Sequence, residues 1–376
     1  MAKPRLLHVF STFNLGGPQA RAVQLMDAWG EEYAHSIVSV TRGELAARER
    51  LGASVTVDFP EFPDLKSGSL PSRLLASRNR VRELNPDLIL TYNWGAIEVV
   101  MSARLFGGPP LIHHEDGFGP DELTVQLPRR VWFRRFALPG AKCLIVPSKT
   151  LERAARAVWK RPQASIAYVP NGIEVALFDA TLSPRAIPGL DRADNVLQVG
   201  TVTGLRKEKN LPRLVRVFAE AARGLNARLV IVGAGPEHDA ILEEARARGV
   251  AIRVHLPGFL PGPHRYVGLF DVFAITSDTE QFPLSLVEAM AARLPVVCTA
   301  VGDIPEIVSA ENRPHVTPTE DEAILAVNLR KLLSDADLRR KIGGANRARV
   351  EREFTLRAMC ERYHSLYEKA RSGRLD

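Results

Sequence analysis

The chain has 376 residues, of which 45% are hydrophobic and 25% charged, and its formal net charge is +7. These values exclude a collagen, a disordered tail protein and a disulfide-rich miniprotein, and the length predicts two or three domains at about 150 residues each. No apolar run approaches the roughly 20 residues that span a bilayer. Three widely spaced cysteines and the lack of a long apolar N-terminal stretch argue against a disulfide framework, a cysteine-based metal site and a signal peptide, so we expect a cytoplasmic protein.

Short apolar runs alternate with helical patterns along the first half of the chain. The expected strands cover residues 5–10, 36–40, 54–57, 87–91, 110–113 and 143–147. The expected helices between them cover residues 19–29, 70–84, 96–106 and 149–159. This alternation predicts an α/β fold with a parallel sheet covered by helices, and the continuous apolar run at 87–91 is typical of a strand that is buried on both faces.

The same pattern restarts in the second half. Residues 180–195 contain prolines, a glycine and scattered charges, and we interpret them as a linker. The expected strands beyond it are 196–200, 227–233, 252–256, 271–277 and 295–299, and the expected helices are 211–224, 236–248, 283–293, 323–333 and 356–370. The chain is therefore predicted to form two doubly wound domains of comparable size. Because ligands bind beyond the carboxyl ends of the strands in such sheets, we expect a ligand in the cleft between the two domains.

The most informative stretch follows a predicted strand and reads Ser-Asp-Thr-Glu-Gln-Phe-Pro-Leu-Ser-Leu-Val-Glu. Pro283 suits the first turn of a helix, so that Glu280 lies just before the helix and Glu288 lies in its second turn. Free N–H groups at Leu284 and Ser285 and the positive helix end favour an anion such as a phosphate. A diphosphate there could extend toward Glu288, whose carboxylate can accept two ribose hydroxyls, and Glu280 could accept sugar hydroxyls. The same spacing also fits an ordinary amphipathic helix with a solvated acid at each end.

A series of motifs in the chain resembles the large family of retaining glycosyltransferases with the GT-B fold, known as family 4 or glycosyl transferases group 1. The specific match is the Glu-x7-Glu element formed by Glu280 and Glu288. It is followed by Ala-Met-Ala-Ala-Arg-Leu-Pro-Val-Val and by Gly-Asp-Ile-Pro-Glu from Gly302. Further matches are Pro-Asn-Gly-Ile from Pro170, Leu-Arg-Lys-Glu-Lys-Asn from Leu205 and Gly-Ala-Gly-Pro from Gly233.

The resemblance implies two Rossmann-like domains that face a central cleft. The acceptor-side domain would cover residues 1–180, the nucleotide-sugar domain 181–355, and a C-terminal helix at 356–376 would cross back to the first domain. The implied reaction moves a sugar from a UDP- or GDP-linked donor to an acceptor hydroxyl with retention of configuration and without a cofactor. In the family the leaving phosphate is expected to take the acceptor's proton. No Asp-x-Asp element lies in a suitable loop at a strand end, so we expect no metal.

The resemblance also implies roles for residues of the second domain. Glu288 would hold the ribose and Glu280 the sugar, and Arg206 and Lys209 would neutralise the leaving diphosphate, although a solvated basic turn is the ordinary alternative for such cations. Related sequences commonly carry an arginine at the position of Gly204, and we expect Arg206 to substitute for it. The remaining expected donor-binding residues at the helix start are Gln281, Phe282, Pro283, Leu284 and Ser285.

Two stretches of the first domain are also candidates for the site. Gly16 and Gly17 follow the first strand and could let a backbone approach a donor phosphate or a sugar closely, or they could simply form a tight turn. The stretch His-His-Glu-Asp-Gly-Phe from His113 ends another strand, and the family often has a histidine there near the reacting sugar. We predict that His114 faces the cleft, with His113 and Asp116 as alternatives. His114, Asp116 and Glu280 are thus the predicted catalytic residues.

Positive charge is concentrated in residues 126–161, which contain ten Lys or Arg and a single acid, Glu152. This segment carries +9, so the rest of the chain carries −2 and we expect one basic surface without general nucleic-acid affinity. Apolar residues such as Trp132 and Phe136 interleave with arginines on a predicted helix. That pattern fits an anionic membrane surface, and hence a lipid-linked or glycolipid acceptor, but it fits a core-packed helix with solvated arginines as well.

Two other functions are compatible with these motifs. A nucleotide-sugar 2-epimerase on the same fold would turn over its donor without any acceptor. A non-enzymatic protein built around the basic segment would bind a membrane or a nucleic acid and would have no catalytic activity.

Overall fold

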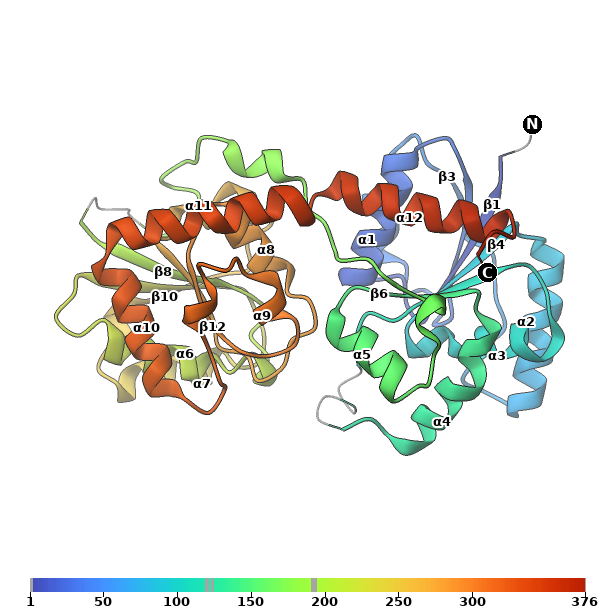
Figure 1. Ribbon diagram of the computed structural model, residues 1–376, viewed down its shortest axis with the longest axis horizontal. Coiled ribbons are helices and arrows are strands. Elements are labelled where there is room, and N and C mark those ends of the chain that lie inside the picture. Colours follow the sequence, from blue (N-terminus) through green and yellow to red (C-terminus); the bar gives the residue numbers. More distant parts are fainter. Residues whose placement is uncertain (1–2, 119–121, 123–124, 191–194, 376) are drawn as a thin grey trace. The chain divides into compact units, whose positions relative to one another are not determined.

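The computed structural model describes residues 3–118, 122, 125–190 and 195–375 (Figure 1). The chain divides into two compact units. Unit 1 comprises Met1–Pro170 and Met359–Asp376, and unit 2 comprises Asn171–Ala358. Residues 171–180, which the sequence analysis assigned to the first domain, therefore fold with the second, because side chains such as Ile173 and Val175 join the core of unit 2. Part of the predicted linker, residues 191–194, lies outside the described residues.

Unit 1 contains a seven-stranded parallel sheet in the order β3-β2-β1-β4-β5-β6-β7. The strands are β1 Arg5–Phe10, β2 Ala34–Ser39, β3 Thr56–Asp58, β4 Leu88–Tyr92, β5 Leu111–His114, β6 Cys143–Val146 and β7 Ile166–Tyr168. The sequence had indicated all of these except β7, which is too short to show a pattern of its own. Every residue of β4 is buried, as its continuous apolar run predicted.

The strands of unit 1 are connected by helices that begin and end at recognisable signals. They are α1 Gly17–Trp29, α2 Leu70–Leu84, α3 Ile97–Phe106, α4 Pro128–Ala137 and α5 Lys149–Ala157. Helix α2 is typical, since the side chain of its N-cap Ser69 accepts a hydrogen bond from the N–H of Ser72 and Asn85 ends it in the left-handed conformation.

Unit 2 contains a six-stranded parallel sheet in the order β10-β9-β8-β11-β12-β13. The strands are β8 Leu197–Val202, β9 Ala227–Val232, β10 Val254–Gly258, β11 Val272–Ile275, β12 Val296–Thr299 and β13 Val316–Thr317. The helices are α6 Leu211–Ala221, α7 His238–Ala247, α8 Leu284–Ala291, α9 Ile304–Ile307, α10 Glu322–Ser334 and α11 Ala336–Glu353. The prediction of two doubly wound α/β units is thus confirmed, whereas β13, α9 and α11 were not foreseen.

The last helix, α12 Leu356–Arg371, starts in unit 2 and belongs to unit 1 from Met359 onward (Figure 1). Its apolar residues at helical spacing pack into unit 1, where Tyr363 and Tyr367 are buried. The Tyr33 hydroxyl donates to Glu368 Oε1 at 2.8 Å and ties the helix to the end of α1. Within the described ranges, no helix is long and apolar enough to cross a bilayer.

In both sheets the strand order reverses next to the first strand of the unit. The reversal lies between β1 and β4 in unit 1 and between β8 and β11 in unit 2. At such a point the loops that leave neighbouring strands diverge to opposite faces of the sheet, and space for a ligand opens beyond the carboxyl ends of the strands. The fold therefore marks one position in each unit where a site is expected.

The sheet of unit 1 also buries a pair of hydrogen-bonded histidines. His8 Nε2 lies 3.0 Å from His35 Nδ1, and His8 Nδ1 lies 3.0 Å from the hydroxyl oxygen of Tyr92. Burial lowers the pKa of His35 to about 4 and holds the pKa of His8 well below its usual value. Both imidazoles are therefore neutral at pH values where a histidine of the unfolded chain is already protonated.

We expect unit 1 to lose stability in mild acid. The unfolded chain binds protons as the pH falls through about 6.5 and the folded chain does not, so His35 alone should cost roughly 2–3 kcal/mol of unfolding free energy between pH 6.5 and pH 4.5. Urea unfolding at pH 7.5 and pH 4.5 measures this loss. His35→Gln should reduce it, and His238→Gln, which changes an exposed histidine, should leave it unchanged. Equal losses in all three proteins would contradict the assignment.

Candidate functional site

Two opposite charges meet where the strand order of unit 2 reverses. Lys209 lies in the loop after β8, and Glu280 lies in the loop after β11. Lys209 Nζ is 2.7 Å from Glu280 Oε1, and the Ser277 hydroxyl donates to the same oxygen at 2.7 Å. The two charged side chains are only 13% and 11% exposed, so their attraction is weakly screened. A cation and a hydrogen-bond acceptor are thus held side by side at the expected ligand position.

Backbone and side-chain contacts hold these two loops against each other. The N–H of Asp278 donates to the carbonyl of Glu208 at 2.9 Å. Asn210, in the left-handed conformation, caps α6 through its side-chain oxygen, and its Nδ2 donates to Asp278. Arg213 pairs with Asp278 at 2.8 Å and donates to the carbonyl of Thr276 at 3.0 Å. No motif indicated the Arg213–Asp278 pair, because the two residues come from separate segments.

The loop after β12 supports the Glu280 segment by close backbone contact. Gly302 has a φ of +55°, and a Cβ at that position would lie 2.1 Å from the carbonyl oxygen of Glu280. The N–H of the next residue, Asp303, donates to the carbonyl of Gln281 at 3.1 Å. Only glycine fits at position 302, which explains why the Gly-Asp-Ile-Pro-Glu motif begins with glycine.

Helix α8 begins immediately after this supported segment. Pro283 is the N-cap of the helix and not its first residue, so the helix begins at Leu284, one residue later than predicted. The carbonyl of Pro283 accepts the N–H of Leu286 at 3.1 Å. Phe282 is buried against the ring of Phe354, with ring centroids 5.6 Å apart, so it anchors the helix start by packing. Ser285, in the first turn, is half-buried. The positive end of α8 therefore lies beside the Glu280 loop.

Glu288 lies in the second turn of α8 and is the least satisfied acid of this region. Its side chain is half-buried and has no hydrogen bond or ion pair with any other described residue. Burial raises the pKa of Glu288 to about 7, and its charge contributes to raising the pKa of the buried Tyr266 hydroxyl. A partly buried carboxyl without a partner is costly, and such groups are typical of binding sites.

Arg206 stands at the rim of the same region. Its side chain is 62% exposed and pairs with Glu208 at 3.2 Å. In this structure Arg206 is therefore a solvated side chain of a basic turn, the alternative given in the sequence analysis. A Cβ at Gly204 would lie 3.4 Å from Arg206 Nε. The arginine thus reaches the space where a side chain at position 204 would begin, which is consistent with the predicted substitution.

The loop after β9 packs against the loop after β8. Gly233 and Gly235 have φ of +154° and +157°, and a Cβ at either would collide with the carbonyl of Thr203 or Leu205, at 1.8 and 2.4 Å. The N–H of Leu205 donates to the carbonyl of Ala234 at 3.0 Å. The Gly-Ala-Gly-Pro motif therefore positions the chain that leads to Arg206 and Lys209.

In unit 1 the predicted glycines lie at an open helix start. Gly16 is the N-cap of α1 with a φ of −162°, which any residue adopts, and Gly17 is the first residue of the helix. Both are exposed, and no atom lies within 4 Å of a Cβ built on Gly17. A Cβ built on Gly16 would lie 2.7 Å from Gln19 Oε1. Backbone conformation does not require glycine at either position, so the open space at the start of α1 lies at Gly17.

Asp116 is bound by an arginine that the sequence analysis missed. Arg21, in α1, grips both carboxylate oxygens of Asp116, through Nη1 at Oδ1 and through Nη2 at Oδ2, the latter at 2.9 Å. The backbone N–H of Asp116 donates to Asn93 Oδ1 at 2.7 Å. Arg21 is almost fully buried and lies over the ring of Tyr363, 5.5 Å from its centroid. The pair joins α1 to the loop after β5 at the reversal point of the sheet.

His114 is enclosed by the protein. Its Nδ1 is 3.1 Å from the carbonyl oxygen of Thr91 and its Nε2 is 2.9 Å from the hydroxyl of Tyr367, so Nδ1 donates and Nε2 accepts. The ring stacks on Tyr92 and is 1% exposed. Burial and the nearby Arg21 hold the pKa of His114 well below its usual value. The alternative residue, His113, is also buried, so Asp116 is the most exposed of the three candidates.

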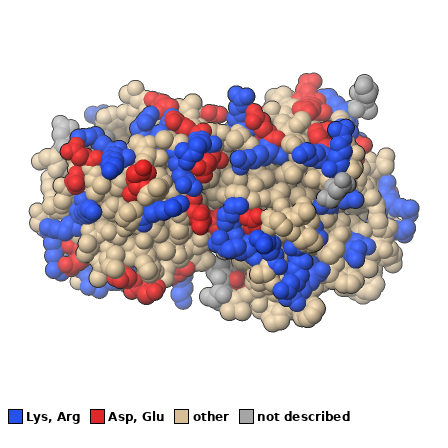
Figure 2. All heavy atoms as spheres, viewed as in Figure 1, with Lys and Arg blue, Asp and Glu red and all other residues tan. Residues whose placement is uncertain are grey.

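Part of the basic segment is neutralised inside unit 1. Arg134 is fully buried and pairs with Glu122 at 3.1 Å, and its guanidinium lies over the rings of Trp94 and Trp159, about 5.1 Å from each centroid. Arg130 pairs with the same acid at 3.0 Å. Glu122 lies just outside the segment, so counting charges within 126–161 overestimated the free charge. Figure 2 shows Lys and Arg side chains gathered over α4 and α5.

Exposed aromatic groups accompany the remaining cations on α4. Trp132 and Phe136, one helical turn apart, are 67% and 56% exposed. Exposed cations of the segment that remain available include Arg129, Arg156 and Lys160.

Across residues 3–118, 122, 125–190 and 195–375 no group of three or more His, Cys, Asp or Glu is placed to hold a metal ion.

Comparison with known proteins agrees with this arrangement. The family described as Glycosyl transferases group 1 matches residues 186–349, and the family described as Glycosyl transferase 4-like domain matches residues 16–172. Both halves of the chain thus match glycosyltransferase families, group 1 in the second half and the 4-like domain in the first. The family that the motifs resemble is thereby confirmed.

Individual relatives are more distant. N-acetyl-alpha-D-glucosaminyl L-malate synthase of Bacillus anthracis is 29% identical over 210 residues, which cover 55% of this chain and 54% of the relative. A putative colanic acid biosynthesis glycosyltransferase of Escherichia coli, WcaL, is 29% identical over 225 residues, 55% of this chain and 52% of that protein. The chain thus spans about half the length of these curated relatives.

A solved structure matches the whole chain. HepE of Anabaena, in complex with UDP, has a TM-score of 0.79 and 18% identity, and the match covers 98% of this chain and 100% of HepE. This likeness shows the GT-B fold, with two Rossmann-like domains, as the sequence predicted.

The Arg21–Asp116 pair yields a stability prediction. Asp116→Ala should destabilise unit 1 by roughly 3 kcal/mol, because it leaves the buried Arg21 charge without a partner. Arg21→Met combined with Asp116→Leu should recover most of that loss. Urea unfolding of the three proteins measures the free energies. Equal instability of the single and double variants would show that the charge pair is not what holds α1 to the β5 loop.

Proposed function

We propose that this chain is a retaining, metal-independent glycosyltransferase that moves a sugar from a nucleoside-diphosphate sugar to an acceptor hydroxyl. The observation that carries the proposal is Glu288, a half-buried carboxyl without a partner and with a pKa of about 7. It lies one turn from the start of α8, the helix that follows the Glu280 loop and its ion pair with Lys209. Two vicinal ribose hydroxyls would supply the hydrogen bonds that this carboxylate lacks. The UDP in HepE supports a UDP-linked donor, and a GDP-linked donor fits the same groups.

The diphosphate would lie at the start of α8. The N–H groups of Leu284 and Ser285 and the positive helix end favour an anion there, without any metal. Lys209 would exchange part of its contact with Glu280 for a phosphate oxygen, and Arg206 would swing in from the rim. Both cations would then stabilise the negative charge that develops on the leaving diphosphate. Glu280, released in part, would accept a hydroxyl of the donor sugar.

The transfer itself would take place on one face of the sugar. The bond between the anomeric carbon and the diphosphate breaks, the acceptor oxygen bonds to the same face, and a leaving phosphate oxygen takes the acceptor's proton. Glu280 is an unsuitable nucleophile, because the Ser277 hydroxyl donates to its Oε1 at 2.7 Å and, in the proposed complex, the carboxylate accepts a hydroxyl of the donor sugar. A mechanism without a protein nucleophile fits these contacts better.

Unit 1 would supply the acceptor side. The open space at Gly17, beside the N-cap Gly16 of α1, leaves room for a sugar or a phosphate. Asp116, the most exposed of the three candidates, would contact the reacting groups, and His114, with both nitrogens occupied, would position the strand end as a neutral ring. A polysaccharide acceptor is supported by the relative named for colanic acid biosynthesis.

A lipid-linked acceptor would require unit 1 to meet a membrane. Trp132 and Phe136 on α4 expose apolar rings next to cations that have not been neutralised, which is the pattern of an interfacial helix on anionic lipid. Such a surface would bring a cytoplasmic enzyme to the inner face of the membrane without a spanning helix.

We expect Glu288 to control nucleotide affinity and its pH dependence. In a thermal-shift and calorimetric screen of UDP- and GDP-sugars, one nucleotide class should raise the melting temperature, and Glu288→Ala should weaken binding about tenfold or more. Because a protonated carboxyl cannot accept both hydroxyls, the affinity of the intact protein should also fall as the pH drops below 7. Glu288→Gln should remove that dependence, and the exposed Glu243→Gln should not alter it.

The same screen can refute the proposal. Binding that is unaffected by Glu288→Ala, or no binding of any nucleotide, would contradict it. With a bound donor and an acceptor, the anomeric configuration of the product, read by NMR, distinguishes retention from inversion. Turnover of the donor without an acceptor would instead indicate an epimerase.

We expect the chain to bind vesicles that contain about one third phosphatidylglycerol and not vesicles of phosphatidylcholine alone. Trp132→Ala combined with Phe136→Ala should weaken that binding about tenfold or more, because the two rings that the bilayer would bury are lost. Ile252→Ala, which removes an exposed apolar side chain of unit 2, is the matched control. Co-sedimentation measures the bound fraction, and equal binding by all three proteins would exclude α4 as the membrane contact.

A further inference from the structure

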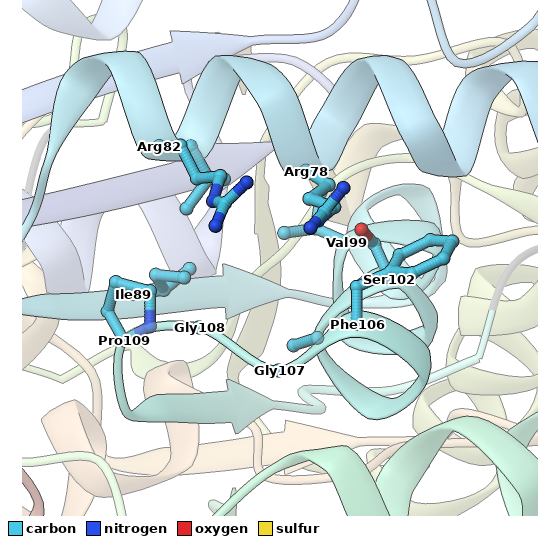
Figure 3. Close-up of a pocket in the computed structure, with 11 residues that line it drawn as sticks. Arg78, Arg82, Ile89, Val99, Ser102, Phe106, Gly107, Gly108 and Pro109 are labelled. Carbon is cyan, nitrogen blue, oxygen red and sulfur yellow. The ribbon is translucent and has the colours of Figure 1, made fainter.

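A cavity with two arginines lies near the amino ends of β4 and β5 in unit 1, whereas the ligand position at the reversal point lies beyond the carboxyl ends of the strands. It has a volume of about 100 Å³ and lies between α2, α3 and the turn that leads into β5. Ile89 and Val99 form part of its apolar lining, and Gly107, Gly108 and Pro109 form its rim (Figure 3). The volume corresponds to roughly three water molecules, which is enough for one small tetrahedral or planar anion but not for a nucleotide.

The cations of this cavity lack acceptors. Arg78 and Arg82 are one turn apart on α2, and Figure 3 shows both guanidinium groups on the cavity side of the helix. Neither has a hydrogen bond or an ion pair with another residue of the described chain. Other arginines of the same helix are satisfied, since Arg73 pairs with Glu98 at 2.7 Å and Arg80 pairs with Glu83 at 2.8 Å.

Local helix energetics do not account for this pair. A cation in the last turn of α2, where Arg82 lies, is favoured by the helix dipole. A second cation one turn earlier on the same face adds like-charge repulsion of a few tenths of a kcal/mol. Arg78 is in addition held over the ring of Phe106, 5.5 Å from its centroid, which restricts its guanidinium to the cavity mouth. Both guanidinium groups thus face the same cavity.

The rim of the cavity allows a ligand to approach the backbone. Gly107 and Gly108 have φ of +67° and +145°, and no atom lies within 4 Å of a Cβ built on either. A larger cavity of about 360 Å³ lies against the same turn, and Lys142 contributes to its lining. The two cavities share Ala103, Gly107, Gly108 and Pro109, so a molecule that places an anionic group between the arginines has room to extend along the turn.

We propose that Arg78 and Arg82 form a binding site for a phosphate group, separate from the donor site of unit 2. Planar guanidinium forks bind tetrahedral phosphate oxygens in pairs, and two of them neutralise a doubly charged group. The phosphate comes either from the free anion, which the small cavity accommodates alone, or from a phosphomonoester whose body lies in the neighbouring cavity.

Calorimetric titration of the full chain tests this site. The Lys209→Ala background weakens phosphate binding at the donor site, so that the remaining binding reports on unit 1. In that background, Arg78→Gln with Arg82→Gln should weaken binding of inorganic phosphate about tenfold or more. Arg246→Gln, which changes an exposed arginine in the last turn of α7, should leave the affinity within about twofold of the background. Melting temperatures without phosphate check that every variant is folded.

Two further measurements separate the possible outcomes. Glycerol 3-phosphate that binds more tightly than inorganic phosphate assigns the site to phosphomonoesters, and the reverse order assigns it to the free anion. Crystals soaked in tungstate should show an anomalous peak between the two guanidinium groups. Phosphate binding that survives the double substitution, or an anomalous map without a peak there, would overturn the proposal, whatever the donor site does.

Discussion

The contact between Lys209 and Glu280 joins the two loops that leave the sheet of unit 2 where its strand order reverses. Its geometry depends on positions that tolerate almost no change, since Gly302 lies against the Glu280 backbone and Gly233 and Gly235 lie against the loop that leads to Lys209. The fold thus holds the Lys209 ammonium and the Glu280 carboxylate together where both are nearly buried. It also leaves the carboxyl of Glu288 without a hydrogen-bond partner among the described residues. Stability is given up at this point, as is common where a protein binds a ligand.

The two units treat their buried charges differently. In unit 1, Arg21 with Asp116 and Arg134 with Glu122 are closed pairs, and the aromatic rings of Tyr363, Trp94 and Trp159 cover the guanidinium groups. These pairs join α1 and α4 to Asp116 and Glu122, which follow β5. In unit 2 the corresponding region keeps an unsatisfied carboxyl and an exposed Arg206, both of which can change partners when a ligand arrives. The paired buried charges of unit 1 and the charges of unit 2 that can change partners are consistent with the proposed roles of unit 1 as the acceptor side and unit 2 as the donor side.

Local sequence patterns were sufficient for most of the architecture. Buried parallel strands such as β4 are continuous apolar runs, helix starts carry Ser, Asn or Pro, and the Glu-x7-Glu spacing places two acids around one helix start. Short elements such as β7 and β13 have no periodicity to detect. The domain boundary was predicted at residue 180 because the linker pattern begins there, yet Ile173 and Val175, which precede it, belong to the core of unit 2.

Pairings between distant segments were beyond reach of the sequence. Nothing near His114 indicates that Tyr367, from the last helix, will cover it, and nothing in α1 marks Arg21 as the partner of Asp116. The excess of positive charge in 126–161 was real in composition, but Glu122 cancels part of it in space. Charge counts therefore locate a surface only after internal ion pairs have been subtracted.

The most direct measurement of the central claim is a crystal structure of the chain with the nucleotide sugar that it binds. The account predicts ribose hydroxyls within hydrogen-bond distance of the Glu288 carboxylate and a diphosphate at the start of α8 that contacts Lys209. A nucleotide bound elsewhere, or a ribose that leaves Glu288 without a partner, would contradict it.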